Sequence, residues 1–90
     1  MGKNTGKNIG KNIVKCREIN GMSQQYLAKK VGISAQGLLK IENGIVSPRV
    51  ATLEKIMFVL CITPNQLFGL EQITEANSSI VGKLRRLQGL

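Results

Sequence analysis

The feature that most constrains this chain is residues 23–44, SQQYLAKKVGISAQGLLKIENG, which predict two short helices joined by a tight turn. A serine precedes each helix, Ser23 and Ser34, and its oxygen accepts a hydrogen bond from a backbone N–H that the helix leaves unpaired. Gly32 supplies a left-handed turn between the helices, and Gly44 ends the second helix in the same way. Two marked starts and two marked ends therefore delimit the helices.

Apolar residues recur at helical spacing in both helices, so each can bury one face against the other. Ala28 lies four positions before Gly32, and its small side chain lets the helices cross closely. The positions expected in the core are Leu27, Ala28, Val31, Ile33, Leu38 and Ile41.

A helix is also predicted before this pair, over residues 10–19, where Ile13 and Cys16 face inward. Upstream lies a repeat, GKNT-GKNI-GKNI at residues 2–13, with a lysine at every fourth position. Like charges at that spacing repel on a helix and each glycine costs up to ~1 kcal/mol there, so residues 1–8 are predicted to be a disordered basic arm. Such an arm either follows DNA phosphates or a minor groove, or is a solvated extension.

A fourth helix is predicted after residue 47, with Ser47 as its N-cap and Pro48 at its first position, where a missing N–H is harmless. Its expected buried stripe consists of Val50, Leu53, Ile56, Met57 and Leu60.

A capping box from Thr63 to Gln66, with Pro64 at the first helical position, predicts a short fifth helix. Leu67 and Phe68 are expected to close the core. The predicted fold class is therefore all-α, a compact bundle of five short helices over residues 9–69. A C-terminal tail follows at residues 70–90.

The tail has two parts. Residues 71–79 are polar and predict a loop or a frayed helix, whereas an apolar stripe follows at Ile80, Val81, Leu84 and Leu87. This stripe is a dimer contact, docks onto the same chain, or belongs to a disordered basic tail.

The net charge and the histidine and cysteine content limit the functions that this chain can have. Thirteen lysines and arginines against five acidic residues give a net charge of +8, which indicates either a polyanion partner or solubility alone. The chain has no histidine, and Cys16 and Cys61 lack metal-ligand spacing, so neither a metal site nor a Cys-His catalytic pair is expected. Both cysteines are predicted to be buried, reduced thiols, which suits a cytoplasmic protein. No apolar run is long enough to cross a membrane.

The pattern S-Q-x-x-L-A-x-x-x-G-I-S, followed by a short helix ending I-E-N-G, resembles the Cro and phage-repressor type of helix-turn-helix DNA-binding proteins. The resemblance spans about residues 9–69 and implies a lambda-repressor-like DNA-binding domain of bacterial, phage or mobile-element origin. The residues in register are Arg17, Gln24, Ala28, Gly32, Ile33, Glu42, Asn43, Gly44 and Pro48.

The resemblance implies that the second helix of the pair enters the major groove of double-stranded DNA, with Ala35, Gln36 and Lys40 at the base edges. A glutamine amide can pair with adenine, a lysine can donate to guanine, and an alanine methyl can touch a thymine methyl. Ala35 and Gly37 depart from the residues usual at their positions, so readout by hydrogen bonds rests mainly on Gln36 and Lys40.

The resemblance also implies phosphate contacts from Gln24 and Asn43, and an ion pair between Arg17 and Glu42 that joins the first helix to the third. Ser34 and Arg49 are further phosphate candidates. Arg49 is expected in the first turn of a helix, where a cation opposes the helix dipole, so its presence there suggests an anion outside the chain. Arg49 is otherwise a tolerated surface residue. Lys29 and Lys30 are also candidates for phosphate contact, although lysines on a helix surface are most often simply solvated.

The predicted function is a sequence-specific transcriptional regulator, a repressor that binds a palindromic operator as a homodimer. The alternative is an antitoxin or coactivator-like module that uses the same fold to bind a protein. No nucleophile stands with a general base, so neither an enzyme, a small-molecule substrate nor a cofactor is predicted.

Overall fold

Six helices and no strands make up the part of the chain that the computed structural model describes, residues 5–78. The all-α fold class is confirmed. In chain order the helices are α1 (Thr5–Ile19), α2 (Gln24–Val31), α3 (Ala35–Glu42), α4 (Val50–Leu60), α5 (Pro64–Leu67) and α6 (Glu75–Ser78).

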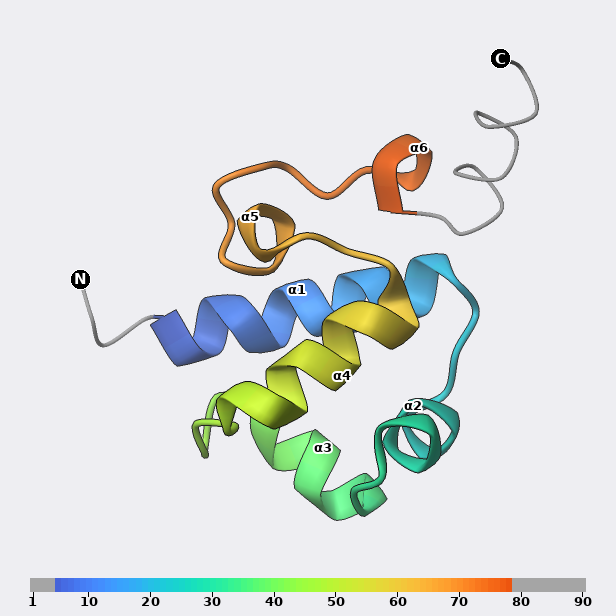
Figure 1. Cartoon of the computed structure of the whole chain (residues 1–90), viewed down its shortest axis with the longest axis vertical. Coiled ribbons are helices and arrows are strands. Elements are labelled where there is room, and N and C mark those ends of the chain that lie inside the picture. Colours follow the sequence, from blue (N-terminus) through green and yellow to red (C-terminus); the bar gives the residue numbers. More distant parts are fainter. Residues whose placement is uncertain (1–4, 79–90) are drawn as a thin grey trace.

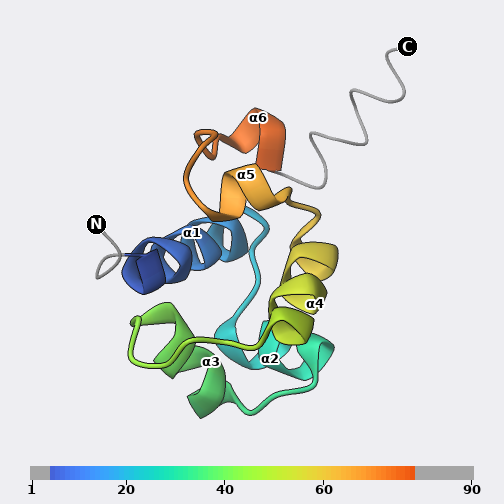
Figure 2. The ribbon, with the colours of Figure 1, turned by 60° about the vertical axis from the view of Figure 1, so that its left-hand side comes forward.

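The core lies where α1 meets the other helices. Figures 1 and 2 show α2 and α3 at one end of the bundle and α5 and α6 at the other, with α1 and α4 between them. α1 contacts α3, α4, α5 and α6, while α2 packs against α3 and α4. The apolar side chains with no exposed surface are Ile13, Cys16, Leu27, Leu38, Ile56, Leu60 and Leu67.

The predicted caps of the central helix pair are confirmed. Ser23 Oγ accepts a hydrogen bond from Tyr26 N at 3.0 Å, and Ser34 Oγ accepts one from Gly37 N at 2.9 Å. Gly32 has a φ of 87°, and its N–H donates to the carbonyl oxygen of Ala28. These contacts are all made within a few residues along the chain, so the sequence alone could predict them.

The sixth helix corrects the prediction of five. Residues 71–79 were expected to form a loop or a frayed helix, but a reciprocal cap holds one turn of α6 in place. Thr74 N donates to Asn77 Oδ1 at 2.8 Å, and Asn77 N donates to Thr74 Oγ1 at 3.2 Å. Gln66 Nε2 also donates to Asn77 O and to Ser78 Oγ, which joins α6 to α5.

The predicted start of α4 is wrong. The N-cap is Arg49, with extended backbone and no side-chain hydrogen bond, so Ser47 caps nothing and Pro48 precedes the helix. Val50 is 72% exposed because the first turn of α4 extends beyond the core, whereas Ile56 and Leu60 are buried.

Two other expected core residues lie at the surface because each follows the end of a helix. Phe68, the C-cap of α5, is 45% exposed, so Leu67 alone closes the core there. Cys61, the C-cap of α4, has a left-handed φ of 55° and an exposed side chain, whereas Cys16 is buried as predicted. Neither cysteine forms a disulfide.

The first helix begins at Thr5 and not at Gly10, so residues 5–8, expected in the arm, are helical. Gly10 has a packing role here. A Cβ atom at this position would overlap the carbonyl oxygen of Glu42 and lie 2.7 Å from that of Ile41. α1 therefore approaches the end of α3 more closely than any other residue would allow. Residues 1–4 and the apolar stripe at residues 80–87 lie outside the described residues.

We expect Gly10→Ala to lower the free energy of unfolding by about 2 kcal/mol, because the added methyl group must push α1 away from two backbone carbonyls. Asn8→Ala is the matched control, since Asn8 is exposed on the same helix and alanine favours helix formation. Urea unfolding of both variants measures the difference. Equal stability of the two variants would contradict the close approach.

Candidate nucleic-acid interface

α3 separates a buried face from an exposed one. Leu38, Ile41 and Glu42 are buried against α1 and α2. Four other residues from α3 and its C-cap are exposed: Gln36, Leu39, Lys40 and Asn43. Figure 2 shows α3 at the end of the bundle away from α5 and α6, and among residues 5–78 these four side chains remain exposed. The arrangement matches a helix that is held from behind and presented to a partner.

The residues predicted to read bases lie together on α3. Gln36 and Lys40 are exposed and four positions apart, so they share one face, and Ala35 is half-buried beside them. Sequence reasoning missed Leu39, which is 41% exposed on the same helix. Its signal was present, because only one of two adjacent leucines can lie on the buried stripe. An exposed leucine on this helix offers apolar contact to a thymine methyl group.

Gly37, which differs from the residue usual at its position in the resembling family, affects the N-terminal cap of α3. Its N–H donates to Ser34 Oγ, and a Cβ atom here would lie 3.1 Å from that oxygen, which is a tight contact. The glycine thus leaves space around the N-terminal cap of α3. Ser34 uses its oxygen to accept this bond, and its hydroxyl can still donate its own hydrogen to a phosphate.

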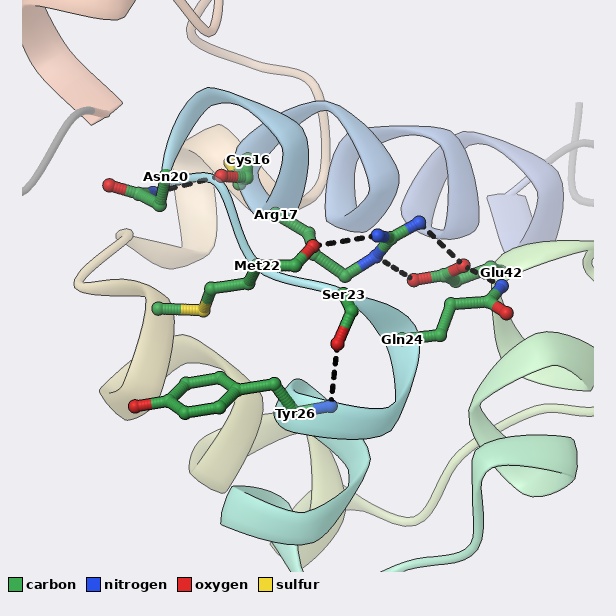
Figure 3. Close-up of polar contacts among 8 residues, drawn as sticks. All are labelled: Cys16, Arg17, Asn20, Met22, Ser23, Gln24, Tyr26 and Glu42. Atoms are coloured by element: carbon green, nitrogen blue, oxygen red, sulfur yellow. Dashed lines mark hydrogen bonds and ion pairs between the residues drawn. The ribbon is translucent and has the colours of Figure 1, made fainter.

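A buried carboxylate ties α3 to the two helices before it (Figure 3). Arg17 Nε donates to Glu42 Oε2 at 2.9 Å and Arg17 Nη2 to Glu42 Oε1 at 3.4 Å, with side-chain exposures of 12% and 2%. Arg17 Nη1 also donates to the carbonyl oxygen of Met22 at 2.8 Å. The ion pair that the resemblance implied is therefore present, and it joins α1 to α3.

Gln24 completes this network, a contact that sequence reasoning missed because it joins residues far apart in the chain. Its Nε2 donates to Glu42 Oε1 at 2.7 Å. The amide group has a second hydrogen, which it can donate outward to a phosphate. Gln24 is also the first residue of α2, where backbone N–H groups favour anions.

The remaining phosphate candidates lie near the two ends of the α3–α4 connection. Asn43 is exposed as the C-cap of α3, and Arg49 is exposed as the N-cap of α4. A hollow of about 320 Å³ borders the end of α3, and it is lined by Lys11, Val14, Glu42 and Asn43.

The two lysines of α2 are exposed, and one has a partner of its own. Lys30 Nζ lies 5.4 Å from the centre of the Tyr26 ring, within the range of a cation–π contact. This contact gives Lys30 a local role on α2, whereas Lys29 is exposed without such a ring contact among the described residues.

Residues 5–78 offer neither a metal site nor a membrane-spanning helix. No three histidine, cysteine or acidic side chains in that range lie close enough together to hold a metal ion. None of the helices there has both the length and the apolar character that crossing a bilayer requires.

Comparison with known protein families identifies the class. Residues 13–67 match the helix-turn-helix family model, which covers α2, the turn, α3 and the helices that support them. The chain belongs to the Cro/C1-type helix-turn-helix family and is a DNA-binding transcription regulator. No match to the chain was found among the curated proteins or the solved structures.

We expect Glu42→Ala to lower the free energy of unfolding by about 3 kcal/mol, because it leaves the Arg17 guanidinium largely buried without its carboxylate. The double variant Arg17→Met with Glu42→Leu should recover most of that loss, since no charge is then left unpaired. Chemical denaturation measures both. Glu54→Ala is the control, because Glu54 is exposed on α4. A Glu42→Ala variant as stable as this control would contradict the structural role.

Proposed function

We propose that this regulator is a repressor that binds a palindromic DNA operator as a homodimer. The observation that carries the proposal is the exposed face of α3, which holds Gln36, Leu39 and Lys40 while the opposite face is anchored through Glu42. A helix anchored in this way keeps its side chains in a constant register against base pairs. Its operator is in the cytosol or nucleoid, and we place the protein there.

The chemistry of α3 suggests which bases it reads. The Gln36 amide both donates and accepts, which suits the N6 and N7 edge of adenine, and the Lys40 ammonium donates to O6 or N7 of guanine. Leu39 and Ala35 are the apolar neighbours that suit thymine methyl groups. Specificity then comes from few contacts, because Gly37 has no side chain to add one.

Phosphate contacts position this helix. Ser34 and Asn43 cap the two ends of α3, Gln24 begins α2 and Arg49 caps α4, and each side chain has a hydrogen-bond donor for a phosphate. The net charge of +8 adds long-range attraction to DNA and makes binding depend on salt.

The need for two copies follows from the length of α3. A helix of 8 residues is roughly 12 Å long, and base pairs stack about 3.4 Å apart, so one copy reads only a few of them. Two copies related by a two-fold axis place two such helices about one turn of DNA apart. Repression follows if the bound dimer covers a promoter.

Footprinting of the full chain on the DNA upstream of its own gene tests this model. We expect protection of two inverted half-sites whose centres are about 34 Å apart, because each half-site receives one copy of α3. Sedimentation of the complex should show two protein chains on each duplex. One chain per duplex, or protection of a single half-site, would contradict the homodimer.

Gln36→Ala should weaken binding to the selected operator by roughly 1–3 kcal/mol and leave binding to random-sequence DNA almost unchanged, because it removes base readout alone. Arg49→Gln is the contrasting variant, since neutralising a phosphate contact should weaken both complexes alike and reduce their salt dependence. Fluorescence anisotropy titrations against both duplexes measure these effects. If both variants bind like the parent, α3 does not read this DNA.

A protein partner is the second candidate function, and one observation favours it. Four apolar side chains outside α3 are strongly exposed, namely Ile45 (68%), Val50 (72%), Phe58 (72%) and Leu70 (80%). In an antitoxin or coactivator these side chains would contact the partner protein. A stoichiometric partner recovered from native cells, together with DNA binding that does not respond to salt, would favour this function over repression.

A further inference from the structure

Lys11 and Lys15, the last two of the lysines spaced four positions apart near the N-terminus, lie on α1 and form a surface separate from α3. α1 begins at Thr5, so Lys11 and Lys15 are one helical turn apart, and both are exposed. The sequence from Thr5 to Arg17 contains no acidic residue. This part of α1 therefore carries positive charge alone.

Lys11 lies beside Asn43, one of the residues proposed to contact phosphate. It lines the hollow at the end of α3 together with Glu42 and Asn43. The contact of Gly10 with the carbonyls of Ile41 and Glu42 fixes the position of the adjacent turn of α1 against α3. Figure 2 shows α1 beside α3, and the two helices are in contact. Lys11 therefore lies next to the end of α3 that is proposed to contact phosphate.

Neither lysine of this pair is neutralised by an ion pair among residues 5–78. Lysines four positions apart on a helix repel by a few tenths of a kcal/mol. Among residues 5–78 the one ion pair joins Arg17 to Glu42, so neither Lys11 nor Lys15 has an acidic partner there. A row of phosphates would relieve this repulsion and release counterions on binding.

We propose that Lys11, with Lys15 one turn further along, contacts the phosphate backbone of the same DNA duplex next to the stretch bound by Asn43. This inference rests on the proposed DNA-binding function and deepens it. The surface formed by Lys11 and Lys15, the α1 lysine face, adds affinity without reading sequence. It lengthens the DNA segment that each copy of the chain covers.

The test uses the full chain and the duplex that it selects from a randomised pool. Lys11→Gln and Lys15→Gln are compared with Lys55→Gln, which removes the same charge from an exposed position on α4. Affinity is measured between about 50 and 200 mM salt, and the slope of log K against log salt should become shallower by about 0.9 for each phosphate that the variant no longer neutralises. Lys11→Arg should keep the parental slope.

A second measurement locates the contact. Single phosphates of the duplex are replaced by neutral methylphosphonates, and the replacement that weakens the parent but not Lys11→Gln identifies the phosphate that Lys11 contacts. The same comparison with Asn43→Ala identifies the phosphate that Asn43 contacts. We expect the phosphates contacted by Lys11 and Asn43 to be neighbours on the same strand of the duplex.

Three results would overturn the inference. The first is that Lys11→Gln and Lys55→Gln change the slope equally, which indicates net charge alone. The second is that Lys11→Gln lowers the melting temperature with an unchanged slope, because Lys11 then only stabilises the C-terminal end of α3. In both cases a Gln36→Ala variant that loses operator preference shows that the proposed function still holds. The third, a parent chain that binds no DNA, would overturn both.

Discussion

The position of α3 depends on the carboxylate of Glu42. That group is almost fully buried, and burial of a carboxylate is costly unless charged and polar donors surround it. Arg17 from α1 and Gln24 from α2 supply those donors, so three helices meet at one side chain. A shift of any of the three helices would break a hydrogen bond to a buried charge. The network therefore restricts the angle at which α3 leaves the bundle.

The same end of α3 is also held through the backbone. Gly10 lets α1 come against the carbonyls of Ile41 and Glu42, while Leu38 and Ile41 pack into the core. The residues of α3 that pack into the core or bind Arg17 all lie on one side of the helix, so its exposed side is not needed to hold α3 in place. Its polar residues are then available for a partner. Because the chain belongs to a family of DNA-binding regulators, we propose the major groove of DNA as the partner of this face.

The sequence predicted features that depend on neighbouring residues. The caps at Ser23, Ser34 and Thr63 are confirmed, because a side chain and an N–H three residues later meet wherever the helix is placed. Errors occurred where the result depended on distant packing. Val50, Cys61 and Phe68 each follow a helical or apolar pattern, yet they lie beyond the part of their helix that reaches the core. The roles of the α3 residues toward DNA stay predictions.

By itself, the sequence determined the helix pair, its turn and the family, because caps, a left-handed glycine and apolar spacing are local properties of the chain. Only the tertiary structure showed that Gln24 and Arg17 both donate to the Glu42 carboxylate. It also showed that Gly10 allows α1 to pack closely against α3, and that Lys11 lies beside Asn43. Each of these contacts joins residues separated by a turn or a whole helix. Their distances depend on how the helices pack, and no local pattern contains that information.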